Sequence, residues 1–178
     1  MTGTKYLKPA SVEEACAIIA EHGPLAKPLA GGTDLLVQWN TRSNKPELLV
    51  SLKNLGMDQI QQDPNGDLVI GSLSTINCML DNEIIREKYP ALCEAAVDFG
   101  SEQVRNRATI GGNLCNGSPA ADMALPLMAL GARITVAGVQ GTRELDLNGF
   151  FVGPGKTALL PGDLLTEIRL PACPDASA

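Results

Sequence analysis

The chain has 178 residues, enough for one domain or for two small lobes that share a core. Its hydrophobic fraction of 44% and charged fraction of 19% are typical of a globular protein rather than a disordered one. A net charge of −6 and an aromatic content of 3% argue against nucleic-acid binding, which usually needs a basic stripe and stacking platforms. We therefore expect the partners to be small molecules or other proteins.

The sequence shows no membrane-spanning or targeting segment. No stretch approaches 18 consecutive apolar residues, and residues 1–9 lack the apolar core of a signal peptide. These observations favour a cytoplasmic location. The five cysteines have no C-x-x-C spacing, so we expect free thiols and no metal site.

The first third of the chain predicts a small parallel α/β lobe. Ser11 and Glu14 have the spacing of a capping box, and the helix that follows should end near Gly23. A short apolar run at 28–30 leads into a double glycine. A second helix is expected at 35–39 and a strand at 47–52.

The rest of the chain predicts a lobe with helices and an antiparallel sheet, which makes the fold class α+β. Asn65-Gly66 is a turn signal before a strand at 68–71, and helices are expected at 74–80, 90–97 and 119–130. Residues 133–137 and 142–147 alternate like a hairpin, and 164–170 should form a last strand. We thus expect lobes of about 1–55 and 56–171. Residues 172–178 would be a tail, or the start of a linker to a missing C-terminal domain.

Residues 28–35 form a candidate anion-binding loop, Pro28-Leu29-Ala30-Gly31-Gly32-Thr33-Asp34-Leu35. Its glycines permit positive φ and the close approach of a ligand. Successive N–H groups and the start of the following helix favour phosphate, and the Thr33 hydroxyl can donate to it. Alone, such a stretch is more often a plain turn into a helix.

A second stretch, Thr109-Ile110-Gly111-Gly112-Asn113, has the same ingredients and is followed by Asp122. It too is, alone, more often a turn than a site. Two such loops in one small domain favour a dinucleotide, because its doubly charged pyrophosphate needs many hydrogen-bond donors.

Other sites are weakly supported. No G-x-G-x-x-G follows a strand, which argues against a Rossmann site, and Phe150 stands where a P-loop ending at Gly155-Lys156-Thr157 would need glycine. His22 is the only histidine, and its place at a helix C-terminus favours capping over catalysis. Binding loops without catalytic side chains suit a domain whose cofactor does the chemistry.

The two glycine motifs resemble those in the medium subunits of molybdenum hydroxylases of the xanthine dehydrogenase and carbon monoxide dehydrogenase type. The similarity extends, in order, over residues 6–15, 113–122 and 159–171. It implies a two-lobed fold of the vanillyl-alcohol oxidase type, in which non-covalent FAD lies extended between the lobes. A domain that family members carry beyond Pro171 has no counterpart in this chain.

The resemblance also implies roles for individual residues. Pro28 to Leu35 match the loop around the FAD pyrophosphate, and Thr109 to Asn113 match a second loop at the phosphates and ribityl chain. Phe99 matches a residue that touches the cofactor, Asp122 a polar contact, and Leu165 an apolar contact near the flavin ring. No catalytic side chain and no metal ligand is implied.

The function implied by the resemblance is electron transfer within an oxidoreductase complex. Electrons would leave a molybdopterin centre on a large subunit and cross 2Fe-2S clusters on an iron–sulfur small subunit. They would then reach this flavoprotein, which passes them to NAD, dioxygen or another acceptor. Two alternatives stay open: a stand-alone FAD-dependent oxidoreductase of the same fold, and a non-catalytic docking module.

Overall fold

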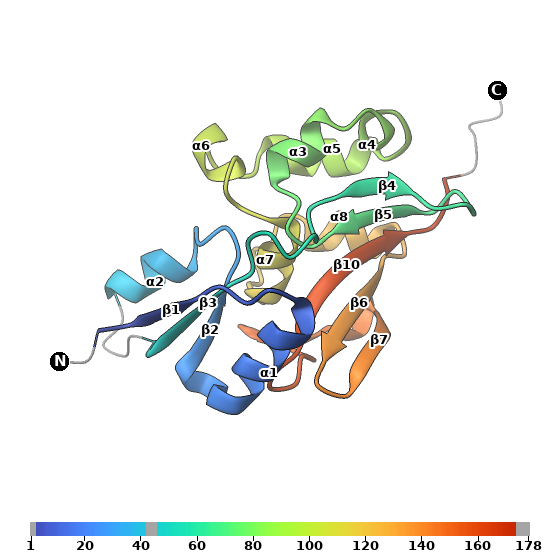
Figure 1. Cartoon of the computed structure of the whole chain (residues 1–178). Coiled ribbons are helices and arrows are strands. Elements are labelled where there is room, and N and C mark those ends of the chain that lie inside the picture. Colours follow the sequence, from blue (N-terminus) through green and yellow to red (C-terminus); the bar gives the residue numbers. More distant parts are fainter. Residues whose placement is uncertain (1–2, 42–45, 174–178) are drawn as a thin grey trace, which may run out of the picture.

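The computed structural model describes residues 3–41 and 46–173, which form two main sheets surrounded by short helices (Figure 1). The smaller sheet is parallel and consists, in spatial order, of β1 (Lys5–Leu7), β3 (Leu48–Ser51) and β2 (Ala26–Leu29). The larger sheet is antiparallel and consists, in spatial order, of β4 (Ile60–Gln62), β5 (Leu68–Gly71), β10 (Leu164–Leu170), β6 (Arg133–Gly138) and β7 (Gly141–Asp146). A separate hairpin joins β8 (Phe151–Gly153) and β9 (Lys156–Thr157).

The helices are short. They are α1 (Val12–His22), α2 (Leu35–Thr41), α3 (Ile76–Asp81), α4 (Glu83–Lys88), α5 (Pro90–Val97), α6 (Glu102–Arg105), α7 (Ile110–Cys115) and α8 (Ala124–Ala129), with 3-10 turns η1 (Gly23–Leu25) and η2 (Leu147–Gly149). Within the described ranges, no helix has the length and apolar character needed to cross a bilayer.

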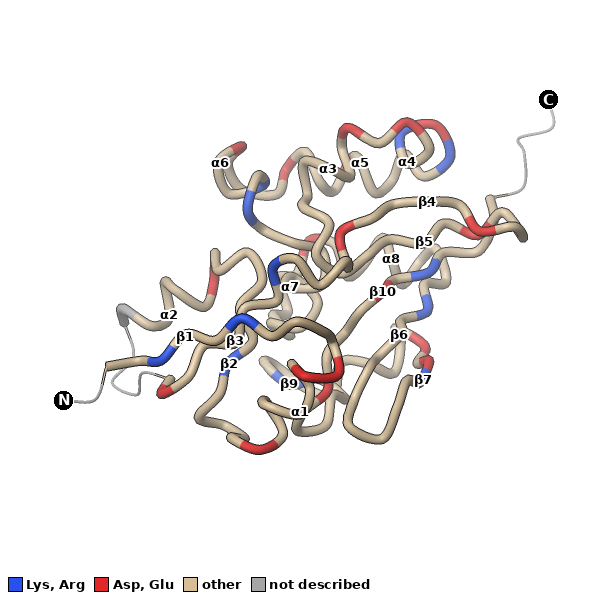
Figure 2. The backbone as a smooth tube through the Cα atoms, in the orientation of Figure 1, with Lys and Arg blue, Asp and Glu red and all other residues tan. Residues whose placement is uncertain are grey.

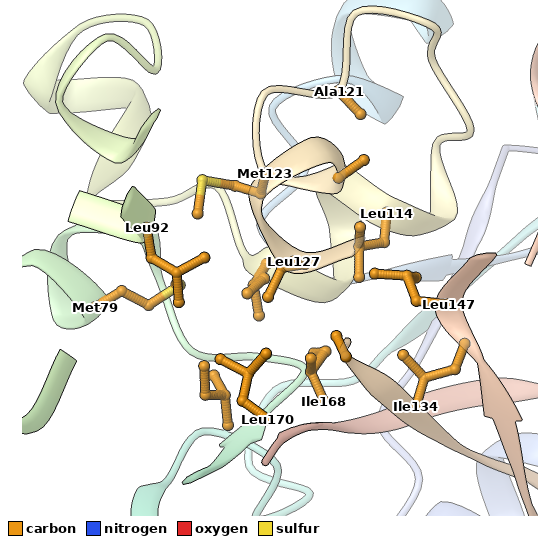
Figure 3. Packing of buried hydrophobic residues seen from close by; sticks show 14 of the residues in the cluster. Met79, Leu92, Leu114, Ala121, Met123, Leu127, Ile134, Leu147, Ile168 and Leu170 are labelled. Atoms are coloured by element: carbon orange, nitrogen blue, oxygen red, sulfur yellow. The ribbon is translucent and has the colours of Figure 1, made fainter. Parts of the chain in front are cut away.

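The main core lies on one face of the antiparallel sheet. Ile134 and Ile168 point from β6 and β10 toward Leu127 of α8 and Leu92 of α5, and all four side chains are fully buried (Figure 3). Side chains alternate between the two faces of a strand, so Ala137 of β6 points to the other side. Helices α3, α4, α5, α7 and α8 therefore contribute side chains to the core on one face of the sheet, and α1 lies on the other.

A second core surrounds α1 and belongs to both sheets. Cys16 and Ile19 of α1 pack with Val50 of the parallel sheet, and also with Leu164 at the start of β10 and Ala137 of β6. The parallel sheet thus shares its core with the antiparallel one. Figure 1 shows α1 below the strands of the small sheet and near the end of the β6–β7 pair that the hairpin turn closes.

The predicted start and end of α1 are confirmed. The Ser11 hydroxyl accepts from the Glu14 amide at 3.2 Å, while the Glu14 carboxylate accepts from the Ala10 amide at 2.6 Å. Gly23 ends the helix with a φ of 51°, and the His22 ring contacts the Ile18 carbonyl at 3.0 Å, as a capping side chain would.

The helix expected at 119–130 is shorter in the structure, where α8 begins only at Ala124. The preceding residues form turns, and the Met123 amide donates to the Asn113 side chain at 3.3 Å, which ties this segment to α7. Strand β1 and helices α4 and α6 were not expected from the sequence. They span three, six and four residues, too few for an apolar period to be visible.

Candidate functional site

A cavity of about 1280 Å³ lies where the loops that follow β2 and β3 meet α7 and the start of β10. The carboxyl ends of parallel strands are the usual place for ligands in α/β units, because loops there can be varied without disturbing the sheet. The volume exceeds that of most small-molecule sites, which span roughly 300–1,000 Å³. An extended ligand with two ring systems suits such a space.

Most of the residues predicted from the sequence line this cavity: Pro28, Ala30, Gly31, Gly32, Thr33, Asp34, Leu35, Phe99, Thr109, Gly111, Gly112, Asn113 and Leu165. Three others lie outside its lining. Ile110 is fully buried in the main core, Leu29 lies at the end of β2 against Gly32, and Asp122 is exposed.

The first glycine loop is packed tightly against the chain that leads to the second. A Cβ atom on Gly31 would lie 1.9 Å from the carbonyl oxygen of Arg107, so no other residue fits there without a backbone shift. Gly32 has a φ of 80°, as the sequence predicted for this loop. The helical hydrogen bonds of α2 begin at Leu36, whose amide donates to the carbonyl of Gly32 at 3.1 Å. The amides of residues 33–35 therefore precede the hydrogen-bonded part of the helix.

The second loop is the start of a helix rather than an open turn. Thr109 is the N-cap of α7, and its hydroxyl accepts from the Gly112 amide at 3.1 Å. Neither Gly111 nor Gly112 has positive φ, so the expectation of that conformation at this motif is wrong. Gly111 is needed for contact instead: a Cβ there would lie 2.6 Å from the Cβ of Ser72.

Hydrogen bonds fix α7 against the segment that follows β5 and against the first lobe. The amides of Ile110 and Gly111 donate to the carbonyls of Ser74 and Ser72, at 3.0 and 2.9 Å. Across the cavity mouth, the side chain of Gln38 on α2 donates to that of Asn116 at 3.4 Å. The two glycine motifs, about 80 positions apart in the chain, thus form one wall.

Asp163 is a charged residue of the cavity wall that sequence reasoning missed. Its side chain is 5% exposed and accepts a bidentate pair of hydrogen bonds from Arg143, at 3.2 and 2.5 Å, and a third from the Leu160 amide at 2.6 Å. The hydrogen bond to Asp163 raises the pKa of the Arg143 guanidinium. A lone aspartate before a buried strand carries no distinguishing signal in the sequence, because its partner lies 20 positions away.

The cavity wall suits an anion held by backbone groups rather than by cations. Lys27 is the only Lys or Arg among the described lining residues, alongside the acidic Asp34, Glu47 and Asp163. Figure 2 shows the Lys and Arg positions spread along the chain rather than gathered around α2 and α7. Cys115 also lines the wall as an exposed residue, and desolvation by the protein atoms around its thiol raises its pKa. The thiol is therefore protonated at neutral pH.

Comparison with known proteins gives the same family as the motifs. Residues 2–173 match the family described as the FAD binding domain in molybdopterin dehydrogenase. The xanthine dehydrogenase FAD-binding subunit of Escherichia coli O157:H7 is 36% identical over 95% of this chain and 58% of that protein. The carbon monoxide dehydrogenase medium chain of Afipia carboxidovorans is 35% identical over 95% of this chain and 59% of that protein. The chain therefore spans about three fifths of the length of these relatives.

Solved structures agree. Carbon monoxide dehydrogenase from Hydrogenophaga pseudoflava superposes with a TM-score of 0.93 and 34% identity, covering 97% of this chain and 60% of that one. UDP-N-acetylenolpyruvylglucosamine reductase from Thermus caldophilus, with a TM-score of 0.57 and 18% identity over 93% of this chain and 54% of that one, shares the fold alone. The expected α+β fold of the vanillyl-alcohol oxidase type is thus confirmed. From its motifs, its fold and these matches, the chain belongs to the family of FAD-binding domains in molybdopterin dehydrogenases.

Proposed function

We propose that this chain binds FAD non-covalently and serves as the electron-transfer flavoprotein of a molybdenum hydroxylase complex. One observation carries the proposal: the first glycine motif packs, at Gly31, against Arg107 just before the second motif, and both motifs line one large cavity. The family match and the names of the relatives support the choice of FAD over other dinucleotides. Residues 1–171 would act as one binding unit made of two lobes.

In this proposal the two loops divide the work of holding the cofactor. Residues 28–35 would surround the phosphates with backbone N–H groups and the Thr33 hydroxyl, which suits an anion in a wall with few cations. Residues 109–113 would contribute closely packed wall surface, because the amides of residues 110–113 already donate to acceptors within the protein. Phe99 and Leu165 would supply apolar contact to the ring systems. Asp122 lies outside the lining, so a polar contact from it would have to reach the cofactor from the rim.

When bound, FAD supplies the capacity to accept and release electrons, which no side chain of this site has. The protein would bind the cofactor, orient it between the two sheets and shield the buried part from water. We further propose that electrons arrive from 2Fe-2S clusters on a small subunit, which receives them from a molybdopterin large subunit. They would leave for NAD, dioxygen or another acceptor, in the cytoplasm.

The test is the visible absorption spectrum of the purified chain before and after addition of FAD. We expect flavin bands, one FAD per chain, and intact FAD in the supernatant after acid precipitation. FAD at 100 times its dissociation constant should add about 2.7 kcal/mol to the free energy of unfolding. Absence of both effects would point to a docking module, whereas flavin retained by the precipitated chain would contradict non-covalent binding.

The loop assignment has its own test in Gly31→Ala. The added Cβ must displace the Arg107 carbonyl, so the first loop should separate from the chain that leads to the second. The affinity for FAD should then fall by roughly 5- to 150-fold, for a misfit of roughly 1–3 kcal/mol. Gly149→Ala is the matched control, because its Cβ would meet open space. Equal dissociation constants for both variants, from a fluorescence titration, would rule out this wall as the binding site.

A further inference from the structure

The loop that follows α5 curls around the guanidinium group of Arg105. Its Nη1 donates to the carbonyl oxygens of Val97 at 3.0 Å, Phe99 at 3.3 Å and Gly100 at 2.9 Å. The last carbonyls of a helix have no partners within it, and a cation is the favoured group at that end. A single side chain on α6 therefore fixes the backbone from residue 97 to residue 100.

Arg105 is itself fixed relative to the core. Its Nε donates to the side-chain oxygen of Asn77 on α3 at 3.2 Å, and the Asn77 amide group donates to Asn106 at 2.7 Å. Helix α3 packs on α5 and contacts α6. The guanidinium plane thus bridges two helices and the loop between α5 and α6, which the point charge of a lysine cannot do in the same way.

Phe99 lies at the centre of this arrangement. Its backbone is bound to Arg105, while its side chain packs on the edge of the main core and lines the cavity. The next residue, Gly100, has a φ of 50°, which turns the chain back toward α6. The direction of the Phe99 ring therefore depends on the loop being held. Arg105 holds it from outside, in addition to the hydrogen bond from the Phe99 amide to the Ala96 carbonyl at 3.3 Å.

We propose that Arg105 is a positioning residue for cofactor binding, because it holds the loop that presents the Phe99 ring to the cavity. The inference rests on the proposed binding of FAD and assigns a role to a residue outside the cavity lining. An aromatic side chain in contact with a base strengthens binding by roughly 5- to 100-fold, so losing the ring or its orientation should weaken binding within that range.

The first experiment is a double-mutant cycle on the dissociation constant of FAD, with Arg105→Gln, Phe99→Leu and the double variant. If Arg105 acts through Phe99, each single change weakens binding and the double variant binds no more weakly than Phe99→Leu alone. Arg105→Lys should bind FAD more tightly than Arg105→Gln but less tightly than the wild type, since lysine keeps the charge but lacks the planar set of guanidinium N–H donors. Arg86→Gln on α4, at an exposed residue outside the cavity lining, is the matched control. Multiplicative effects in the double variant would overturn the proposal.

The second experiment needs no cofactor. In a Trp39→Phe background, Phe99→Trp places the only tryptophan of the chain at position 99. Adding Arg105→Gln should shift its emission to longer wavelength and raise its quenching by acrylamide, with unchanged far-UV circular dichroism. If the wild-type chain binds FAD but Arg105→Gln leaves the emission of the tryptophan at position 99 unchanged, the role of Arg105 alone is overturned. A wild-type chain that binds no FAD would overturn the proposed function and this inference together.

Discussion

Asp63 shows how a single side chain can link stability to pH. Its carboxylate accepts from the amides of Asn65 and Asp67, at 2.8 and 3.0 Å, and pairs with Arg169 on the neighbouring strand β10. Desolvation acts to raise the pKa of Asp63, but the two amides and the guanidinium together hold it below its usual value of 3.8. The ionised carboxylate therefore organises the turn between β4 and β5.

We expect Asp63→Asn to lower the free energy of unfolding at pH 7, and the difference from the wild type to shrink in acid. A depressed pKa in the folded state gives stability that is present above the unfolded value of 3.8 and lost as the pH falls through the folded value. Urea unfolding of both proteins at pH 7, 4 and 3 measures this. Arg169→Gln, which removes one of the three partners, should show part of the same change. A constant difference across this range would contradict the prediction.

At the scale of elements, the structure gives a different reason for the glycines of α7 than the sequence did. From the sequence we expected that they were needed for an unusual backbone conformation. In the structure, Gly111 is needed because a Cβ there would collide with the Cβ and carbonyl of Ser72. Gly111→Ala should therefore cost about 1–3 kcal/mol of unfolding free energy even without FAD. Gly149→Ala, with open space around its Cβ, should cost less than half as much. Equal losses in urea unfolding would show that contact with Ser72 is not the reason for glycine.

How far elements could be predicted depends on how local their causes are. Strand β10 and helix α5 were predicted with the bounds that the structure shows, because punctuating residues are visible locally: Gly162 and Pro171 flank β10, and Pro90 begins α5. Helix α8 was overextended because its start is set by Asn113, which accepts from Met123 ten positions away. The two glycine motifs were visible as local patterns. The packing of Gly31 on Arg107, and the place of Asp163 in the cavity wall, depend on tertiary neighbours that no local pattern reveals.

At the scale of the whole molecule, the shared core around α1 predicts that the two lobes unfold together. Trp39 is the only tryptophan and reports on the first lobe, whereas far-UV circular dichroism reports on all elements. The two signals should give one urea midpoint. Leu164→Ala, at the junction of both sheets, should lower the free energy of unfolding by about 2–5 kcal/mol. The urea midpoint should then fall equally in both signals. Leu125→Ala, at a side chain 76% exposed, is the control. Two separate midpoints would mean that the lobes unfold independently.

The position of β10 also has a consequence for biosynthesis. This strand lies between β5 and β6, yet it follows both in the chain, and its first residue also completes the core around α1. During translation at about 5–20 residues per second, neither sheet can reach its final packing until residues 164–170 have been made. In that interval, the facing edges of β5 and β6 are unpaired, and such edges are templates for aggregation. Strand β10, the last strand of the described residues, is thus the one on which the final packing of both main sheets waits.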